Sequence, residues 1–516
     1  MTPPALTLAD MFDHNRRHFA AATALTVDGM PTSYAALGHL VDGLSQCFGR
    51  YLRPGDRLAI WLPNSAAWVA GFIAASDLGA VVVPVSTRLT ERELRDIVHD
   101  AGAGLLLTGA QYRGRQMFDE AVAAFADEAA APTILCAGDT AAPADWQAWS
   151  ARPAYAPAAP PPDLLCIQYT SGTTSRPKGV MLTQDAWLRT AAFVTRAQVL
   201  TPATQFLSGS PFFHCSGSMH AITVCQLAGC TLHTMSAWDP ELAATLTARF
   251  CCTASHNLFF RDVLAIGGDR MRTQFASMRV AAAVGAPELL LRVQDELGIT
   301  GISNLYGMTE TAGNFTMSFP HDTLAARVQA NGRPQPGNHI RVVDPANGAP
   351  CAPGGEGEIQ MSGHTITPGY FHDAAATQAA FTADGWLRSG DLGRITDDGT
   401  LVYVARLKEV IRTGGENVSP VEIEEALREL PGICEVCAVA VADARLDEVP
   451  AVVVTLHPGA DPDWPGAVAT LRRRLAGYKI PRRIYVADEL PMTATNKVQR
   501  AQVRAMIGNN VVRRVL

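Results

Sequence analysis

Long hydrophobic runs are missing from this chain of 516 residues, although 48% of its residues are hydrophobic. The longest apolar region, Leu58 to Val85, is interrupted by polar residues and by prolines. Because a membrane-spanning helix needs about 20 consecutive apolar residues, the region predicts a strand, a helix and a second strand, and no membrane span. The first residues, Met1 to Pro4, lack the charged and apolar stretches of a signal peptide, so we expect none.

An excess of positive charge and a regular cysteine pattern are also absent. The formal net charge of −7 gives no electrostatic case for nucleic acid as a partner. The eleven cysteines have no regular spacing, which is typical of a reducing compartment, so we expect a cytoplasmic protein. One C-x-x-C pair, Cys434 and Cys437, lies in the apolar run Ile433 to Val441 without a second pair, which favours a core strand over a redox or metal site.

Two common nucleotide-binding patterns are missing as well. A Walker A loop would need Gly-Lys-Ser/Thr five residues after Gly172, where Pro177 stands, and no G-x-G-x-x-G follows a strand-like run. The chain instead contains Tyr-Thr-Ser-Gly-Thr-Thr-Ser-Arg-Pro-Lys-Gly from Tyr169 to Gly179. Its hydroxyls and glycine N–H groups can converge on anionic oxygens, and Arg176 and Lys178 offset the charge. This Ser/Thr-rich loop therefore predicts a polyphosphate site.

The order of apolar and polar segments predicts α/β layers. Short apolar runs such as Val81–Val83 and Leu105–Leu107 alternate with segments of helical period such as Leu94–His99. At 516 residues the chain exceeds the size at which a single hydrophobic core stops growing, so at least two domains are expected. A stretch rich in proline and alanine, Ala151 to Pro162, predicts an irregular connector that leads into the Ser/Thr-rich loop.

The last part of the chain has the pattern of a separate small domain. Beyond the strand-like Tyr403–Ala405, the sequence turns polar at 406–409. Ser419-Pro420-Val421-Glu422 then predicts a helix start, with serine as N-cap, proline at the first position and glutamate at the third. Strand-like runs follow at Cys437–Val441 and Ala451–Leu456. Roughly the last hundred residues therefore predict an α+β domain of their own.

Four further segments follow the Ser/Thr-rich loop in a fixed order: Tyr306–Glu310, Ser389–Arg394, Arg406–Asn417 and Leu490–Lys497. With that loop they resemble the adenylate-forming superfamily, which contains acyl-CoA synthetases, firefly luciferases and the adenylation domains of peptide synthetases. The resemblance covers nearly the whole chain. It implies an α/β fold with a large N-terminal domain of layered sheets and helices (1–405), a hinge (406–409) and a small mobile α+β C-terminal domain (410–516).

The chemistry that the resemblance implies has an electrostatic obstacle. Forming an acyl adenylate brings a carboxylate to the α-phosphate of ATP, and the two anions repel. At ~4 Å and an effective dielectric of ~20, each pair of unit charges costs on the order of 4 kcal/mol, so a cation must lie between them. The resemblance assigns this role to Lys497. It assigns to Glu310 the binding of the Mg²⁺ that neutralises the departing pyrophosphate.

The resemblance also implies a nucleotide site. Thr309 would hydrogen-bond the α-phosphate, and Asp391, helped by Arg406, would accept hydrogen bonds from the ribose hydroxyls. Tyr306 and the segment Gly285-Ala286-Pro287 would enclose the adenine ring. The β- and γ-phosphates would be held by residues of the Ser/Thr-rich loop, namely Thr170, Ser171, Gly172, Thr173, Thr174 and Lys178.

A second half-reaction follows from the implied hinge. Lys408 matches the position about which the small domain turns in relatives. One orientation would bring Lys497 to the phosphate. The other would present Gly414 and Gly415, where glycine leaves a passage for the pantetheine arm of coenzyme A.

Two histidine-containing segments bear on the acid substrate. His214 matches a position where an aromatic residue or a histidine closes the carboxylate pocket, and a half-buried structural histidine is the alternative. With Cys215 and His220 it does not form a convincing metal site. Where many fatty-acid ligases have a mostly apolar stretch, this chain has His256 and Asn257 beside two phenylalanines, which predicts a small or aromatic acid carrying a polar group.

The leading hypothesis is an enzyme, an AMP-forming acid–thiol ligase. It would use ATP and Mg²⁺ to adenylate a small carboxylic acid and would transfer the acyl group to coenzyme A. The alternatives are transfer to a carrier-protein thiol or an amine, and activation of nitrite for diazo formation. A non-catalytic protein of the same fold is disfavoured, because it would have no chemical reason to keep Lys497, Glu310, Asp391 and Lys408.

The sequence leaves two questions of association open. A basic tract, Arg472–Arg474 with Lys479, Arg482 and Arg483, predicts either a solvated helix face or, in a coenzyme A ligase, a contact with the 3′-phosphoadenosine of the coenzyme. We expect a monomer or a homodimer.

Overall fold

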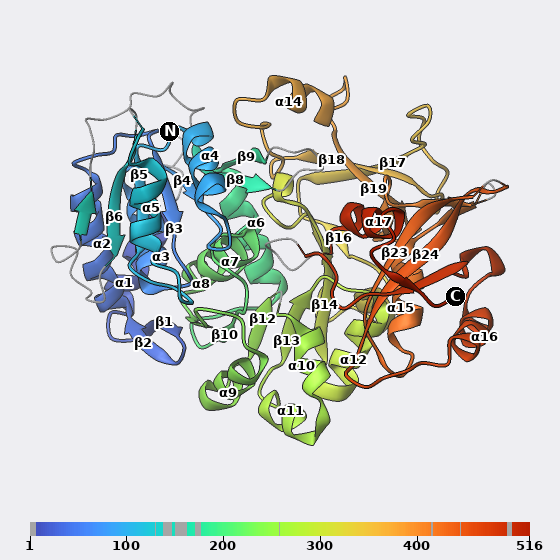
Figure 1. Ribbon diagram of the computed structural model, residues 1–516. Coiled ribbons are helices and arrows are strands. Elements are labelled where there is room, and N and C mark those ends of the chain that lie inside the picture. Colours follow the sequence, from blue (N-terminus) through green and yellow to red (C-terminus); the bar gives the residue numbers. More distant parts are fainter. Residues whose placement is uncertain are drawn as a thin grey trace. The chain divides into compact units, whose positions relative to one another are not determined.

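The chain divides into two units in the computed structural model, which describes residues 7–128, 131–137, 147–149, 163–170, 177–256, 258–413, 416–443, 445–492 and 498–516. Unit 1 contains Met1–Ile340 and Met361–Leu387, and unit 2 contains Arg341–Gln360 and Arg388–Leu516. Each unit combines helices and strands, which confirms the predicted α/β class (Figure 1). The segment 406–409 lies at the end of a strand of unit 2 and in the turn that follows it, and its action as a hinge stays a prediction.

One sheet of unit 1 carries most of the predicted site residues of that unit. Its strands lie in the order β16 (Arg333–Pro334), β15 (Thr316–Met317), β14 (Gly301–Tyr306), β13 (Val280–Ala283), β12 (Ala254–His256), β10 (Gln205–Leu207), β11 (Thr231–Thr234), β1 (Thr23–Val27) and β2 (Met30–Ser33). Neighbouring strands from β14 to β1 are parallel. The carboxyl ends of β10, β12, β13 and β14 therefore meet at one edge, where ligands of open α/β sheets bind.

Another sheet of unit 1 leads into the Ser/Thr-rich loop. Its strands lie in the order β7 (Gln147–Trp149), β6 (Thr133–Ala137), β5 (Leu105–Gly109), β3 (Arg57–Trp61), β4 (Val81–Pro84), β8 (Leu164–Thr170) and β9 (Lys178–Thr183). The predicted strand, helix and strand between Leu58 and Val85 are confirmed as β3, α3 (Ala66–Asp77) and β4. The predicted helix around Leu94–His99 is confirmed as α4 (Glu91–Ala101). The predicted connector at Ala151–Pro162 lies outside the described residues.

Helices cover both faces of each of these sheets. A shared core receives α1 (Leu8–His18), α2 (Tyr34–Phe48), α3, α6 (Gln184–Ala197), η2 (Ser218–Thr223) and α8 (Val224–Ala228). The far face of the β3–β5 sheet packs on α4 and α5 (Met117–Phe125). The far face of the β12–β14 sheet packs on α9 (Pro240–Phe250), α10 (Phe260–Ile266), α11 (Gly268–Gln274), α12 (Pro287–Leu297) and α13 (Leu324–Val328). In the second sheet, β3, β4 and β5 are buried along their whole length, which explains their nearly continuous apolar sequences.

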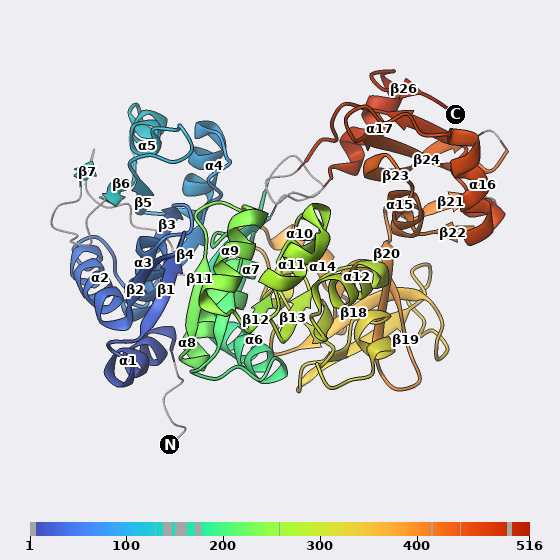
Figure 2. The same cartoon turned by 90° about the horizontal axis from the view of Figure 1, so that it is seen from below.

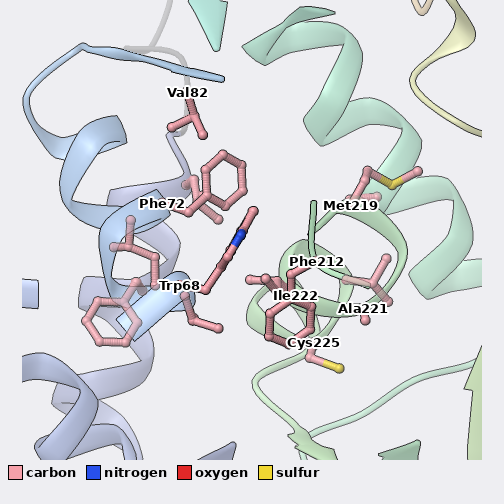
Figure 3. Packing of buried hydrophobic residues seen from close by; sticks show 14 of the residues in the cluster. Trp68, Phe72, Val82, Phe212, Met219, Ala221, Ile222 and Cys225 are labelled. Carbon is pink, nitrogen blue, oxygen red and sulfur yellow. The ribbon is translucent and has the colours of Figure 1, made fainter. Parts of the chain in front are cut away.

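The shared core fixes the segment that carries His214 and His220. Trp68 of α3 lies with its ring centroid 5.6 Å from that of Phe212, and Phe72 lies 5.5 Å from Trp68. Figure 3 shows Trp68 and Phe72 across from η2, which carries Met219 and Ile222, with Phe212 beside Ile222. The large aromatic side chains bury much apolar area. They hold the turn between Phe212 and η2 in one position.

Unit 2 contains a four-strand arrangement and a separate α+β layer. The first has the order β17 (Asn338–Val343), β18 (Gly357–Gly363), β19 (Leu387–Ile395) and β20 (Leu401–Arg406) among the described residues. The second has the order β22 (Glu416–Val418), β21 (Ile411–Thr413), β24 (Asp447–Leu456), β25 (Arg483–Val486) and β26 (Arg513–Arg514), with β23 (Ile433–Asp443) also paired to β24. Figure 2 shows its helices, α15 (Pro420–Arg428), α16 (Trp464–Arg474) and α17 (Arg500–Gly508), around β23 and β24. Residues of α15 and α16 pack on one face of these strands and residues of α17 on the other.

Local expectations for unit 2 are met with one correction. Cys437 is buried in β23 while Cys434 is exposed, and both thiols are free, so the C-x-x-C belongs to a strand as predicted. Ser419 occupies the N-cap position of α15, but its hydroxyl does not cap the helix. It donates instead to the carbonyl oxygen of Val404 at 2.9 Å, which ties the helix start to β20. Within the described residues, no helix has the length and hydrophobicity needed to cross a bilayer.

Candidate active site

The segments predicted to enclose adenine are adjacent at the carboxyl edge of the sheet. Gly285 follows β13, Ala286 and Pro287 begin α12, and Tyr306 ends β14. The side-chain amide of Asn304 donates to the carbonyl oxygen of Gly285 at 3.1 Å, which fastens the β13–α12 turn to β14. A Cβ on Gly285 would lie 2.9 Å from Leu289 Cδ2, so a larger residue would require the Leu289 side chain to shift. The structure thus brings together the residues that the sequence placed around the base.

The motif after β14 forms a tight turn that projects Thr309 and Glu310. The 3₁₀ turn η3 (Thr309–Thr311) is closed by the Thr311 hydroxyl, which accepts from the Met308 N–H at 3.0 Å. Gly313 then has φ +85°, a conformation that favours glycine, and its N–H donates to the Met308 carbonyl at 3.0 Å. A Cβ on Gly307 would lie 2.6 Å from Asn314 Cα. The Tyr-Gly-x-Thr-Glu spacing therefore reflects backbone crowding as well as chemistry.

Glu310 is held by a tyrosine that the sequence analysis missed. Its carboxylate is buried, and Oε1 accepts a hydrogen bond from the hydroxyl of Tyr370 at 2.8 Å. Burial, followed by the charge of Glu310, raises the pKa of Tyr370 well above its usual value, so the hydroxyl stays a donor. The ammonium of Lys178 lies 5.0 Å from the centroid of the same ring. Tyr370 thus contacts the predicted Mg²⁺ ligand and one predicted phosphate ligand, and it lies in none of the sequence motifs.

The strand that follows the Ser/Thr-rich loop, β9, is connected to Glu310 through Thr367. The Thr367 N–H donates to the Glu310 carbonyl at 2.7 Å, and the Thr367 hydroxyl donates to the Met181 carbonyl at 2.6 Å. Thr170 and Lys178 are opposite each other in the β8–β9 ladder and close the base of the loop. The loop residues Ser171, Gly172, Thr173 and Thr174 lie outside the described residues. Their phosphate contacts, like those of Thr170 and Lys178, stay predictions.

His214 has a local structural role and retains a nitrogen that can donate. It is half-buried, and its Nδ1 accepts from the N–H of Ser216 at 3.2 Å and lies 2.8 Å from the Ser216 hydroxyl. Because Nδ1 accepts from the backbone, the neutral ring carries its proton on Nε2. This geometry fits both roles that the sequence allowed for His214, namely closure of the carboxylate pocket and a structural role.

Buried polar groups lie close to Glu310. The pKa of the Cys215 thiol is raised to about 12, by burial and then by the charge of Glu310, so this cysteine is protonated. A Cβ on Gly313 would lie 3.1 Å from Cys215 Cβ and 3.3 Å from His220 Cε1. The His220 ring in turn lies against that of His256 at a centroid separation of 4.1 Å. Cys215 and His220 therefore surround the turn that follows Glu310.

Glu310 has the chemistry of a magnesium ligand. Mg²⁺ binds hard oxygen ligands and is commonly held by one or two carboxylates together with phosphate oxygens and water. A carboxylate has about four acceptor positions, and Tyr370 uses one of those on Glu310. Among the described residues, no group of three His, Cys, Asp or Glu could hold a metal by itself. This donor set fits a cation shared with a phosphate better than a site made of protein ligands alone.

Within unit 2, the predicted ribose ligand is ordered by its neighbours. Asp391 is buried on β19, and Arg406 Nε on β20 lies 2.9 Å from its Oδ1. The two residues are opposite each other in the β19–β20 ladder, which explains why motifs distant in sequence act together. The Leu407 N–H donates to the Gly390 carbonyl at 2.9 Å and begins the turn that carries the exposed Lys408. Asp391 and Arg406 are thus brought together as predicted.

The described residues include neither Lys497 nor Gly414 and Gly415. The described residues on either side of these positions are held by hydrogen bonds and strand pairing. Met492 and Val498 form a bridge, and the Gln499 N–H donates to the Pro491 carbonyl at 2.8 Å. Arg500 follows with a buried contact to Glu424, an ion pair to Glu409 at 3.0 Å and a hydrogen bond to the Ala438 carbonyl at 2.8 Å. Thr413 and Glu416 pair across Gly414 and Gly415. The segments that contain the predicted lysine and glycines therefore begin and end at defined points.

The basic tract of unit 2 is partly engaged in ion pairs. Lys479 contacts Glu422 at 2.7 Å, and Arg474 contacts Glu429. Arg472 and Arg473 are exposed. This agrees with a solvated face, and a contact with coenzyme A stays a prediction.

Comparison with known proteins gives consistent matches along the chain. Residues 12–371 match the family of AMP-binding enzymes, and residues 422–497 match the AMP-binding enzyme C-terminal domain. The chain is 33% identical over 471 residues to a 3-[(3aS,4S,7aS)-7a-methyl-1,5-dioxo-octahydro-1H-inden-4-yl]propanoyl:CoA ligase of Mycobacterium tuberculosis, with 88% of this chain and 90% of the relative covered. It is 34% identical over 503 residues to a feruloyl-CoA synthase of an Amycolatopsis species, with 94% and 96% covered. The crystal structure of ATP-bound MatB from Rhodopseudomonas palustris is similar, with a TM-score of 0.83 and 27% identity over 98% of this chain and 100% of that one.

Proposed function

The chain belongs to the AMP-binding enzymes of the adenylate-forming superfamily, and from this premise we propose that it is an AMP-forming acid–thiol ligase that joins a small carboxylic acid to coenzyme A. A carboxylate oxygen of the acid attacks the α-phosphorus of ATP, and the bond to pyrophosphate breaks. The thiolate of coenzyme A then attacks the acyl carbon, and the bond to AMP breaks. AMP departs more readily than a carboxylate oxygen, so the second step is easier than direct thiol attack on the acid.

The observation that carries the proposal is the connection between Glu310, Tyr370 and Lys178. Glu310, the predicted Mg²⁺ ligand, accepts a hydrogen bond from the hydroxyl of Tyr370 at 2.8 Å, and the ammonium of Lys178, a predicted phosphate ligand, lies 5.0 Å from the centroid of the same ring. Tyr370 holds one carboxylate oxygen and leaves the other acceptor positions for a cation, and Lys178 supplies positive charge nearby. Mg²⁺ bound at Glu310 would neutralise charge on the phosphates. Thr309, beside Glu310, would donate its hydroxyl to the α-phosphate.

The remaining roles follow the family pattern. Tyr306 and Gly285 would enclose adenine, and Asp391 would accept from the ribose hydroxyls while Arg406 fixes its orientation. Lys497 would lie between the acid and the phosphate during adenylation. Lys408 would be the pivot that later presents Gly414 and Gly415 to the pantetheine arm, with the small domain rotating between the two half-reactions. We propose a cytoplasmic location because of the cysteine usage, and a monomer or a homodimer.

The test combines two half-reactions with one variant. Purified protein is supplied with ATP, MgCl₂ and a panel of carboxylic acids, and pyrophosphate release and acyl-CoA mass are followed. Lys497→Ala should lower adenylation by about 1000-fold, because one ion-pair energy of about 4 kcal/mol is lost. It should lower thioester formation from synthetic acyl-AMP far less. Equal loss in both steps would contradict the role of Lys497.

The same assay separates the alternative acceptors. Pyrophosphate release without a CoA ester for any acid would point to a carrier-protein thiol or an amine as acceptor. Pyrophosphate release with nitrite alone would point to diazo formation.

A further inference from the structure

A pair of buried histidines lies against the turn that follows Glu310 and has no evident structural function. His220 lies in η2 and His256 ends β12, and their planes are tilted by 40° at a centroid distance of 4.1 Å. Their exposed fractions are 1% and 0%. Burial lowers the pKa of His256 to about 3, and burial, His256 and His214 lower that of His220 well below its usual value. Both rings are therefore neutral at pH 7.

Three of the four ring nitrogens have no hydrogen-bond partner in the described part of the chain. They are Nδ1 and Nε2 of His220 and Nε2 of His256. A buried polar group without a partner costs about 1–3 kcal/mol, and native proteins rarely retain one without a reason. His220 also lies in a π-helical turn, a rare conformation that is frequent at functional sites. These observations point to a partner that is supplied by a ligand.

The tautomer of His256 determines what that ligand must offer. The Gln198 amide nitrogen donates to the Ser255 carbonyl at 2.8 Å, so its oxygen is directed to the ring and lies 3.3 Å from His256 Nδ1. Nδ1 therefore carries the proton, and Nε2 is an acceptor that needs a donor. His220, also neutral, has one N–H that needs an acceptor and one lone pair.

The residues in register with His256 on the neighbouring strands are small. Along the β12–β13–β14 register, His256 is opposite Ala282, and Ala282 is opposite Ser303. Residues in register on parallel strands share a face, so a methyl group separates His256 from a serine whose hydroxyl also lacks a partner among the described residues. The turn at Gly313 connects His220 to Glu310, as described above. The histidine pair therefore lies against the turn that follows Glu310.

We propose that His220 and His256 bind a hydroxyl group carried by the acid substrate, so that the enzyme is specific for hydroxylated carboxylic acids. The substrate hydroxyl donates to Nε2 of His256 and accepts from the N–H of His220. This inference rests on the proposed function and defines its substrate class. A hydroxyl is a small group that donates and accepts at once. A second carboxylate cannot donate to His256, an ammonium group cannot accept from His220, and a hydrocarbon leaves all three nitrogens unpaired.

The test uses matched acids that differ by one hydroxyl. Benzoate and 4-hydroxybenzoate, cinnamate and 4-hydroxycinnamate, and hexanoate and 6-hydroxyhexanoate are compared in kcat/KM for CoA ester formation. We expect at least one hydroxylated acid to be favoured over its unsubstituted analogue by about 1000-fold or more, because a site that hydrogen-bonds a hydroxyl rejects the analogue that lacks it. In His256→Phe this ratio should fall by about 100-fold, because kcat/KM falls for the hydroxylated acid and not for its unsubstituted analogue. His256→Gln retains an acceptor and should keep part of the preference.

Controls separate this inference from a structural effect. Ser255→Ala removes a buried unpartnered hydroxyl from the opposite face of the same strand, and it should leave the ratio unchanged. His220→Phe should lower the ratio as His256→Phe does, and calorimetric melting shows whether each variant is folded. Wild-type activity that ignores the hydroxyl in every pair, or folded variants that keep the wild-type ratio, would overturn the inference while leaving the ligase function intact.

Failure of the proposed function has a different signature. In that case no acid forms an ester, and titration calorimetry of the same acids into the protein with ATP decides the inference. Hydroxyl-dependent binding that is lost in His256→Phe supports the histidine pair, and binding that is independent of the hydroxyl, or no binding at all, overturns it.

Discussion

His233 and the His220–His256 pair are buried, neutral imidazoles associated with the same sheet, yet their surroundings differ. His233 on β11 has Nδ1 at 2.9 Å from the Thr26 hydroxyl and Nε2 at 2.8 Å from the Gln205 side-chain oxygen. Its ring also stacks on Phe250 at 4.4 Å. The pair at the carboxyl edge has Gln198 as a partner for one nitrogen only, among the described residues. Residues of the chain thus supply hydrogen-bond partners for both ring nitrogens of His233. For the His220–His256 pair, we infer that a ligand supplies the missing partners.

Arg500 in unit 2 extends the comparison to a charged group. Its guanidinium contacts Glu424, Glu409 and the Ala438 carbonyl, and Glu424 accepts as well from the Ala438 N–H at 2.8 Å. Every member of this network is a residue of the chain. By contrast, the Glu310 carboxylate accepts one side-chain hydrogen bond within the described part of the chain, from Tyr370, and would complete its shell with a cation.

Removal of Arg500 should have the largest effect on stability. Arg500→Met leaves Glu424 buried without its main counter-charge, so we expect the free energy of unfolding of unit 2 to fall by about 3–5 kcal/mol. Denaturant unfolding followed by fluorescence measures this. Arg473→Met, at an exposed position of α16, should change it by less than about 0.5 kcal/mol. If the free energy of unfolding falls as little in Arg500→Met as in Arg473→Met, Arg500 does not stabilise the fold as described.

Glu310 should show the opposite profile. Glu310→Gln keeps an oxygen that accepts from Tyr370 but removes the charge, so kcat/KM for adenylation should fall by about 100–1000-fold with little change in the melting temperature. Glu241→Gln, at an exposed pair with Arg270, is the matched control and should retain activity. A large drop in melting temperature with modest loss of activity would show that Glu310 serves the fold instead.

Acid should destabilise the protein through His233. Burial lowers its pKa to about 4, whereas an imidazole in an unfolded chain titrates near 6.5. Because the unfolded state then binds more protons, the stability that neutral His233 contributes is present above pH 6.5 and is lost as the pH falls from about 6.5 to about 4. Wild-type protein should lose roughly 3 kcal/mol more than His233→Phe between pH 7 and pH 4. Parallel losses in both proteins would show that His233 does not titrate as described.

The smallest expected effect is that of His233→Phe at neutral pH. Thr26 and Gln205 lose their partner, so the free energy of unfolding should fall by about 1–3 kcal/mol. The preference for hydroxylated acids should be the same as in the wild type, in contrast to His256→Phe. A changed acid preference in folded His233→Phe would break the distinction between the two kinds of histidine.

The sequence predicted the positions of the site better than its contacts. The strand, helix and strand from Leu58 to Val85 were predictable because apolar runs and breaks determine the order of elements. The neighbourhood of Tyr306 and Gly285 was predictable because family motifs lie at strand ends. Tyr370 was missed because its contact with Glu310 depends on pairing with β9, which no local pattern encodes.

Other features depend on tertiary structure in the same way. The hydroxyl of Ser419 bonds to Val404 because β20 lies beside the helix start, although the local pattern favours a cap. His256 was recognised as a polar residue in an apolar context. Its contact with the His220 ring follows from the packing of η2 against the sheet, which a local sequence pattern does not encode.

The central claim is that His233 has its hydrogen-bond partners within the chain, whereas His220 and His256 receive theirs from the substrate. Nitrogen-15 NMR of histidine-labelled protein would test this claim most directly. Addition of a preferred hydroxylated acid with ATP should shift the His256 Nε2 resonance as its lone pair accepts a hydrogen bond, assigned through His256→Gln, while the His233 resonances stay in place. A His256 resonance that does not move, or that moves no more than those of His233, would contradict the account.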